Sequence, residues 1–202
     1  MQSTRATLLP CPYFGSIEYF SNLLSSNCII EVNDYFVKQS LRTRCVIYGA
    51  NGPLTLTVPK FRKNSSKTLF KDIKINYDHH WQKEHWQSIT SAYRSSPFFE
   101  YYEDEFQPLF QKKYTFLVDL NLEMMSFICS KIGLSTDYKI SENYIKNPDL
   151  DDKRMDTFDN EITKRYMQVF ENKLGFIANL SILDLLFNEG NNSRAYLESI
   201  NT

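Results

Sequence analysis

The chain has almost no excess of charge of either sign. Its 202 residues carry 23 lysines and arginines against 24 aspartates and glutamates, which gives a formal net charge of −1. Nucleic-acid binding normally shows as a basic excess, because the phosphate backbone recruits lysine and arginine. Composition therefore predicts no nucleic-acid partner.

Paired cysteines and metal-ligand spacings are also lacking. Cys11, Cys28, Cys45 and Cys129 form no CxxC pair, so we expect reduced thiols, no metal site and a cytoplasmic protein. No apolar run reaches the length of a signal peptide or a membrane span, and we expect no membrane insertion.

Aromatic residues, by contrast, are abundant. Fifteen Phe and thirteen Tyr help to make the chain 15% aromatic, a composition suited to binding surfaces as well as to cores. The length fits one domain over residues 1–202, since no repeat or low-complexity linker divides it.

The first fifty residues predict an α/β fold with a mixed sheet flanked by helices. Ala6–Leu9 and Cys28–Val32 are short apolar runs typical of buried strands. Between them, apolar residues at helical spacing predict a helix over Ser16–Leu24, with Ser16 as its N-cap. Ligands of open α/β sheets usually bind at the carboxyl ends of the strands.

An inserted antiparallel hairpin is the clearest local prediction. Cys45–Tyr48 and Pro53–Val58 flank a turn that ends at Gly52, and Leu54, Leu56 and Val58 alternate with threonines as in a half-buried strand. The further expected elements are a basic loop over 60–68, a strand over Phe70–Tyr77, helices over Pro97–Phe110 and Thr115–Ile132 ended by Gly133, a strand over Tyr138–Ile140, an exposed loop over Asn147–Asp159 and a closing helix over Leu180–Phe187 ended by Gly190.

Both tryptophans lie in the segment from Trp81 to Tyr102. As a helix, this segment places His85 between Trp81 and Ile89 on one face, with Trp86 and Tyr93 on a neighbouring stripe. An imidazole with an ordinary pKa of about 6.5 suits proton transfer near neutral pH. His85 is therefore either a general acid or base in a cleft, or a hydrogen-bonded core histidine.

A basic segment precedes the hairpin. If Lys38–Arg44 extends the first hairpin strand, Lys38, Arg42 and Arg44 project from one face. Cations on one face require an anion opposite them. That anion is either a phosphate or carboxylate of a ligand, or the acidic side chains of Glu31 and Asp34.

Cys11 lies between Pro10 and Pro12 at the end of the first predicted strand. The prolines stiffen the loop and fix the position of the thiol. A nucleophilic cysteine needs a neighbouring base or cation such as His85 or Arg42; otherwise Cys11 is a small loop residue.

The chain resembles the WbqC-like protein family over nearly its whole length. The specific motifs are W-x3-HW-x2-I-x3-Y-x3-PFF from Trp81 and N-x-S-x-x-D-x-LFN-x-G from Asn179. The resemblance implies a role in bacterial surface-polysaccharide biosynthesis, and its motifs map onto Tyr13, Phe14, Lys38, Arg42, Arg44, Trp81, His85, Trp86, Tyr93, Asn179, Ser181 and Asp184. Many relatives have His-Gln-Pro in the first loop, where this chain has Leu9-Pro10-Cys11-Pro12. If that histidine is catalytic in the relatives, either Cys11 replaces it, His85 is the base, or this chain has another function.

Two functions fit these patterns, and neither identifies a cofactor. The first is an enzyme that transfers an acyl or aminoacyl group to a nucleotide-linked amino sugar. In it Lys38, Arg42 and Arg44 bind phosphate or carboxylate, His85 deprotonates the acceptor, and Trp81, Trp86 and Tyr93 stack on a ring. The second is a non-catalytic protein of the cell-envelope pathway that binds a glycan or a protein.

Two geometric expectations accompany these functions. His85 and at least one of Arg42 and Arg44 should share a cleft, within about 10 Å of each other, where charges still interact at physiological salt. Buried polar groups need partners, so Asn179 and Asp184 should hydrogen-bond to the tryptophan helix or to the basic segment.

Overall fold

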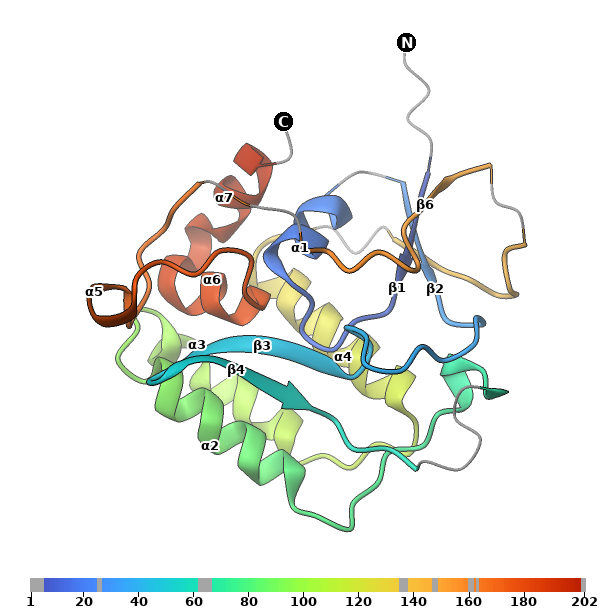
Figure 1. The fold of residues 1–202 in the computed structure, drawn as a ribbon, viewed down its shortest axis with the longest axis horizontal. Helices are drawn as coiled ribbons and strands as arrows, with labels where there is room; N and C mark the ends of the chain where they lie inside the picture. The colour runs from blue at the N-terminus through green and yellow to red at the C-terminus, as the bar shows by residue number, and fades with distance from the viewer. Residues whose placement is uncertain are drawn as a thin grey trace.

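The computed structural model describes residues 6–24, 27–61, 67–134, 138–146, 149–159, 162 and 164–200. Most of the predicted loop over 60–68 and the start of the one over Asn147–Asp159 lie outside these ranges. The described chain combines a parallel sheet, a separate antiparallel hairpin and a group of helices, which confirms the predicted α/β class (Figure 1).

The parallel sheet contains four strands in the order β5-β2-β1-β6. Strands β1 (Thr7–Pro10) and β2 (Cys28–Glu31) form its centre, and their apolar side chains Leu8, Leu9 and Ile30 have no exposed surface. The outer strands β5 (Lys139–Ile140) and β6 (Asp151–Asp152) pair in parallel with β2 and β1. β1, β2 and β5 were predicted, whereas β6 lies in a segment predicted to be an exposed loop.

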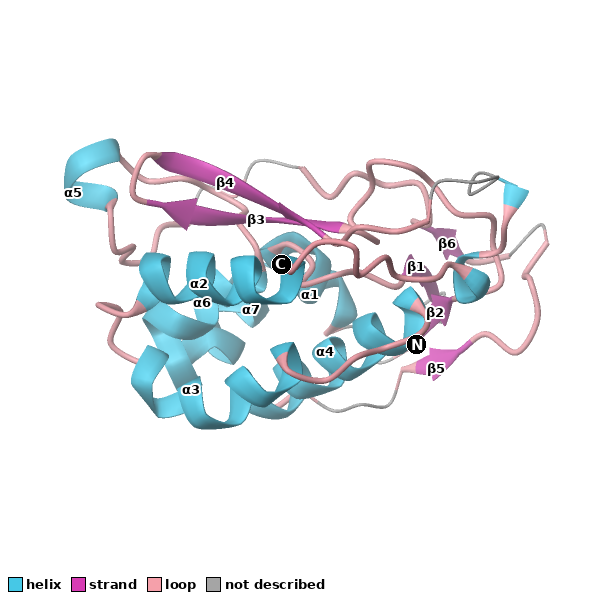
Figure 2. Ribbon diagram, turned by 90° about the horizontal axis from the view of Figure 1, so that it is seen from below, coloured by secondary structure: helices cyan, strands magenta, loops and turns pink. Residues whose placement is uncertain are grey.

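The hairpin consists of β3 (Arg44–Gly49) and β4 (Gly52–Thr57), with Gly49 paired to Gly52. Its existence and turn are confirmed, but the expected alternation holds only in part, since Leu56 and Val58 are buried while Leu54 is 40% exposed. Figure 2 shows the hairpin as a layer above the helices, with the parallel sheet beyond one end.

Helices fill the space beneath the hairpin. Helix α1 (Ile17–Leu23) begins at Ser16, whose side chain accepts a hydrogen bond from the Tyr19 amide as predicted for an N-cap. Its Ile17 and Phe20 side chains have no exposed surface, so the helix is held by the core. The other helices are α2 (Trp81–Tyr93), α3 (Phe99–Phe106), α4 (Leu117–Lys131), α5 (Glu171–Leu174), α6 (Ile182–Glu189) and α7 (Ser193–Ile200), with short 3-10 helices at Phe70–Asp72, Gln107–Phe110 and Gly190–Asn192.

Two predicted strands are absent from their described segments. Residues 38–43 form turns instead of a strand, with Gln39 at a φ of 58°. The segment Phe70–Tyr77 begins with a 3-10 helix and continues through isolated bridges of Lys74 and Ile75. In both segments, alternation of residue type does not reflect strand geometry because tertiary contacts determine the backbone.

Gly133 and Gly190 follow α4 and α6 with φ values of 66° and 53°. These left-handed conformations end the two helices as predicted. None of the helices in the described part of the chain has both the length and the apolar character needed to cross a bilayer.

Replacing Gly52 by valine is expected to lower the free energy of unfolding by about 1–2 kcal/mol, because Gly52 has a φ of 112° that a β-branched residue rarely adopts. A Cβ at this position would meet nothing within 4 Å, so the cost is conformational and not steric. Urea unfolding of Gly52→Val beside Thr55→Val, an exposed position in the same hairpin, measures it. Equal stability of the two variants would contradict the prediction.

Candidate functional site

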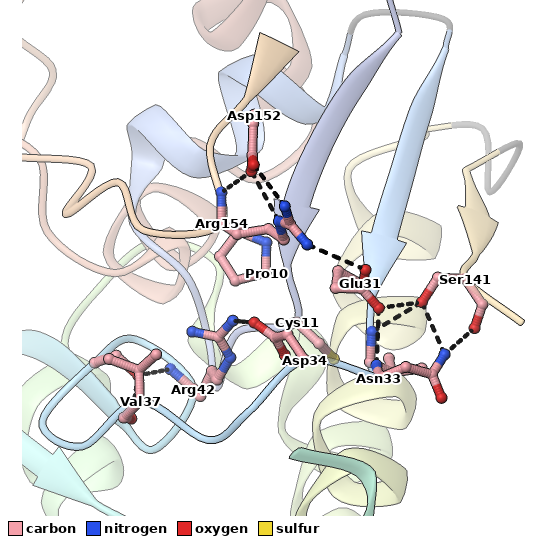
Figure 3. Close-up of polar contacts among 12 residues, drawn as sticks. Pro10, Cys11, Glu31, Asn33, Asp34, Val37, Arg42, Ser141, Asp152 and Arg154 are labelled. Carbon is pink, nitrogen blue, oxygen red and sulfur yellow. Dashed lines mark hydrogen bonds and ion pairs between the residues drawn. The ribbon is translucent and has the colours of Figure 1, made fainter. Parts of the chain in front are cut away.

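The carboxyl ends of the parallel strands lie at one edge of the sheet. Because β1, β2, β5 and β6 all run in parallel, the residues that follow them meet at this edge. Cys11 follows β1, Asn33 and Asp34 follow β2, Ser141 follows β5, and Arg154 follows β6 (Figure 3). The site is built from this edge and from the turn at 37–43.

Asp34 and Arg42 form a buried ion pair. Their side chains are 9% and 1% exposed, and the Arg42 Nη2 donates a hydrogen bond to Asp34 Oδ2. Burial raises the pKa of Asp34 and lowers the pKa of Arg42, while the attraction between the two charges opposes both shifts. The basic segment therefore does meet Asp34, one of the two acidic partners expected from the sequence.

Arg154 forms the second charged group at the sheet edge. Its Nε and Nη2 donate to the two carboxylate oxygens of Asp152 at 2.9 and 2.6 Å, and its Nη1 lies 3.5 Å from Glu31 Oε2. Glu31 has no exposed surface and also accepts hydrogen bonds from the Asn33 amide and the Ser141 hydroxyl at 2.8 and 2.6 Å. This network holds the ends of β2, β5 and β6 together (Figure 3).

Asn121 of α4 links the first loop to the turn. Its side-chain amide donates to the carbonyl oxygens of Cys11 and Arg42, at 3.1 and 2.8 Å. The Tyr13 amide also donates to the Leu41 carbonyl at 2.8 Å. The loop and the turn are consequently held in one arrangement.

Three clefts surround the turn. The basic cleft, of about 460 Å³, is lined by Lys38, Gln39, Thr43, Arg44, Thr57, Val58, Pro59 and Lys60. The hairpin cleft, of about 440 Å³, is lined mainly by the first loop, the turn, the two hairpin strands, residues 157–159 and residues 178–181. The arginine cleft, of about 310 Å³, is lined by residues 37–42 and 154–157. Gln39 lines all three.

Positively charged side chains gather at the basic cleft. Lys38, Arg44 and Lys60 line it, and its described lining residues include no acidic side chain. The buried Nε of Arg44 has no hydrogen-bond partner, and within the described ranges Arg44 makes no ion pair. In the arginine cleft, by contrast, Arg42 and Arg154 are already paired with carboxylates.

Backbone strain is concentrated in the hairpin cleft. Four non-glycine residues of the described chain have positive φ, namely Phe14 (45°), Gln39 (58°), Phe158 (51°) and Asn179 (53°), and all four line this cleft. Hydrogen bonds hold two of these backbones in place: the Asn179 side chain donates to the Phe158 carbonyl at 2.7 Å, and the Ser181 hydroxyl donates to the Phe14 carbonyl at 2.9 Å. Strained residues cluster at functional sites, where the surrounding structure maintains them.

His85 lies beneath the hairpin and not in the clefts that Arg44 lines. Its side chain is 6% exposed, and its Nδ1 is hydrogen-bonded to the Tyr13 hydroxyl at 2.9 Å. The ring nevertheless interacts with the backbone of Thr57, which is the strand partner of Arg44 and lines the basic cleft. The expected distance of about 10 Å between His85 and Arg42 or Arg44 stays a prediction. Burial lowers the pKa of His85 to about 4, so the ring is neutral at pH 7. The cause is desolvation of the charged form and not, as expected from the sequence, the repulsion of the neighbouring cations.

The other expected catalytic residue, Cys11, has no exposed surface. Burial raises the pKa of its thiol far above the usual value, although the positive charge of Arg42 opposes the shift. This environment favours the unreactive thiol over the thiolate that nucleophilic catalysis needs.

The aromatic side chains of α2 face the core. Trp81 and Tyr93 are buried, and the Trp86 ring packs against those of Phe99 and Phe110 at 6.0 and 5.6 Å between centroids. The expected stacking platform of Trp81, Trp86 and Tyr93 is thus part of the packing between helices.

Asn179 and Asp184 both have partners. Asn179 accepts a hydrogen bond from the Glu18 amide at 3.0 Å and donates one to the Phe158 carbonyl, so these two partners belong to α1 and to the Phe158 segment. Asp184 accepts hydrogen bonds from Tyr166 and Gln168. The Tyr93 hydroxyl of α2 is close enough to influence the pKa of Asp184, so the tryptophan helix lies beside this carboxylate as expected.

Asp184→Asn is expected to remove a pH dependence of stability. Burial raises the pKa of Asp184 from 3.8 to about 6, although its hydrogen bonds oppose the shift. Between these values the folded state holds a proton that the unfolded chain releases, so the wild-type contribution falls as pH rises from about 4 to 6, by up to about 3 kcal/mol.

Urea unfolding across this range should therefore show the stability of Asp184→Asn rising relative to wild type. Asp104→Asn, at an exposed position on α3, is the control. A constant difference between Asp184→Asn and wild type would contradict the assignment.

Sequence reasoning missed Arg154, Ser141, Asn121 and Lys60. Arg154 lies in a charge-dense segment, which predicts an exposed loop and not a site. Lys60 belongs to a basic cluster of the kind typical of solvated surfaces. Ser141 and Asn121 have no distinguishing pattern. In the described chain, no group of three or more His, Cys, Asp or Glu residues is arranged to hold a metal ion.

Comparisons with known proteins agree with the motifs. The model of the WbqC-like protein family matches residues 11–161, and the chain belongs to this family. It is also 26% identical over 196 residues to an uncharacterized protein of Mycobacterium tuberculosis (strain ATCC 25618 / H37Rv), Rv1507c, across 80% of this chain and 83% of that protein. No solved structure matches the present chain.

Proposed function

We propose that this protein acts in bacterial surface-polysaccharide biosynthesis and binds an anionic sugar precursor, such as a nucleotide-linked sugar. The resemblance to the family supports the pathway. The observation that carries the proposal is the basic cleft, where Lys38, Arg44 and Lys60 converge and the described lining residues include no acidic side chain. Phosphate and carboxylate groups are the natural ligands of such a cluster.

The arrangement of the clefts supports a ligand with an anionic end and a polar end. Gln39 and Arg44 line both the basic cleft and the hairpin cleft. An anion bound by Arg44 therefore extends into the hairpin cleft, where amide, hydroxyl and carboxylate side chains such as Gln39 and Asp159 suit sugar hydroxyl groups. The strained residues around this cleft keep its shape defined before a ligand enters.

Transfer of an acyl or aminoacyl group is the finer part of the proposal, and it requires a base that reaches the ligand. His85 is buried beneath the hairpin, whereas Asp159 is exposed and lines the hairpin cleft. We therefore assign proton transfer to Asp159. The alternative, a non-catalytic glycan- or protein-binding protein, is favoured by the burial of both His85 and Cys11.

The binding test uses a uridine diphosphate sugar and inorganic phosphate as probes. At a ligand concentration about a hundredfold above Kd, the folded state gains about 2.7 kcal/mol, which a thermal-shift assay detects. Lys38→Ala/Arg44→Ala should weaken binding at least about a hundredfold, because charge-assisted hydrogen bonds contribute roughly 1.5–3 kcal/mol each. Lys113→Ala, which removes a cation outside these clefts, should leave binding unchanged.

Binding that is equal in wild type and the double variant, or absent for both probes, would refute the anion site. Turnover separates the two functions. An enzyme with Asp159→Asn should keep its affinity and lose rate, while affinity without turnover in the wild type supports the binding protein.

A further inference from the structure

A fourth cleft lies among the residues that follow β2 and β5. It shares no lining residue with the three clefts around the turn at 37–43. This tyrosine cleft, of about 340 Å³, is lined by Asn33, Tyr35, Leu69, Lys71, Asn143 and Tyr144. Two of these side chains are large exposed aromatics: Tyr35 is 65% and Tyr144 53% exposed. Aromatic rings left in water beside a cleft are typical of binding surfaces.

The Tyr144 ring is held in place from behind. The Arg154 Cζ lies 5.0 Å from the centre of the ring, as in a cation–π contact. Arg154 is itself fixed by its two hydrogen bonds to Asp152 and by a third, at 3.0 Å, to the Ile145 carbonyl. The guanidinium group therefore orients the ring, while about half of the side chain stays exposed toward the cleft.

The floor of the tyrosine cleft is equally fixed. The Asn33 side chain is 6% exposed, donates to the Ser141 carbonyl at 2.7 Å and accepts from Lys71 Nζ at 2.8 Å. The Tyr35 backbone is anchored by its antiparallel bridge to Leu69. A rigid floor and two tyrosines of low conformational entropy make a preorganised surface, which loses little entropy when a ligand binds.

The chemistry of the tyrosine cleft differs from that of the basic cleft. Its one cation, Lys71, already binds the neutral amide of Asn33, and the remaining polar groups are amides and phenol hydroxyls. Amides and phenols both donate and accept hydrogen bonds, as sugar hydroxyl groups require. Tyrosine rings can cover the apolar C–H face of a sugar ring. We propose that the tyrosine cleft binds a neutral saccharide unit of a glycan, stacked on Tyr144 and Tyr35.

Arg154 connects this site to the turn. It lines the arginine cleft with one part of its surface and supports the Tyr144 ring with another. A glycan on the tyrosine cleft thus lies beside a residue that also lines the arginine cleft next to the turn. The proposal uses no residue of the basic cleft, so it stands or fails independently of the anion site.

Saturation-transfer difference NMR on the full chain tests the proposal. The probes are the methyl glycosides of glucose, galactose, N-acetylglucosamine and rhamnose, with uracil as a flat ligand that is not a sugar. At least one glycoside should show transfer to the protons of one ring face, and Tyr144→Ala and Tyr35→Ala should each weaken its binding at least about tenfold, as for loss of a stacked ring. Tyr144→Phe should retain most of the affinity because it keeps the ring.

Tyr101→Ala is the matched control. Tyr101 is 74% exposed on α3 and lines none of the four clefts. Circular dichroism confirms that each variant is folded before titration. The proposal is overturned if no glycoside binds, if binding is unaffected by both cleft variants, or if uracil alone binds. The Lys38→Ala/Arg44→Ala variant should lose phosphate binding and keep glycoside binding. The failure of one site can therefore be told from the failure of the other.

Discussion

Arg42→Ala is expected to lower the free energy of unfolding by about 3–5 kcal/mol. Removing one partner of a buried ion pair leaves the other charge without compensation in a medium of low polarity. Here the remaining group is Asp34, whose side chain is 9% exposed and whose pKa burial already raises. The substitution also removes the guanidinium group from above the Phe70 ring, 5.7 Å from its centre.

A double-mutant cycle isolates the cause. Asp34→Leu/Arg42→Met replaces both charges by apolar groups and should be more stable than either single variant. Arg94→Ala is the control, because the Arg94–Glu103 pair is largely exposed and should contribute no more than about 1 kcal/mol. Urea unfolding measures the four proteins of the cycle, which are the wild type, Asp34→Leu, Arg42→Met and the double variant, and the Arg94→Ala control. A double variant as unstable as the sum of the single ones would show that the two charges do not depend on each other.

Phe187→Ala is the second substitution with a large expected effect. Phe187 has no exposed surface, and its ring lies 5.1 to 5.7 Å from those of Tyr93, Phe99 and Phe106. These rings come from α2 and α3, so one cavity would loosen the contact between three helices. Phenylalanine-to-alanine substitutions at such sites cost about 3–5 kcal/mol.

The measurement is again urea unfolding, with Tyr101→Ala as a control of the same aromatic type. Tyr101 is 74% exposed, so its loss should change stability by no more than about 0.5 kcal/mol. A small effect of Phe187→Ala, comparable with that of the control, would mean that the helices close the cavity by moving together.

Local patterns were sufficient to predict most of the fold. Ser16, Gly52, Gly133 and Gly190 act as the cap, turn and helix ends that their chemistry implies, since these roles depend on neighbouring backbone atoms. β6 could not be predicted, because Asp151 and Asp152 have the composition of a loop and are ordered by pairing with β1. Helix α7 was also missed.

The candidate site was predictable only in part. Lys38 and Arg44 do line one cleft, but through a turn and with Lys60, not as neighbours on a strand. Arg42, between them in sequence, turns inward to Asp34. The helical stripe placed Trp81 and His85 on one face correctly, yet spacing alone does not show whether that face meets a core or a cleft. That choice depends on the hairpin above it.

The late position of β6 affects how the chain acquires its fold during synthesis. Glu31 is enclosed beside β1, but Arg154, the cation that accompanies it, emerges more than a hundred residues later. The N-terminal turn of α1 is likewise completed only by residues 180–182, which form backbone hydrogen bonds with residues 15–17. A nascent chain that lacks residues 151–182 therefore exposes an incomplete sheet edge and an acidic side chain without its cation. We expect this part of the chain to fold cooperatively only after residue 182 has been synthesised, and such high sequence separation slows folding.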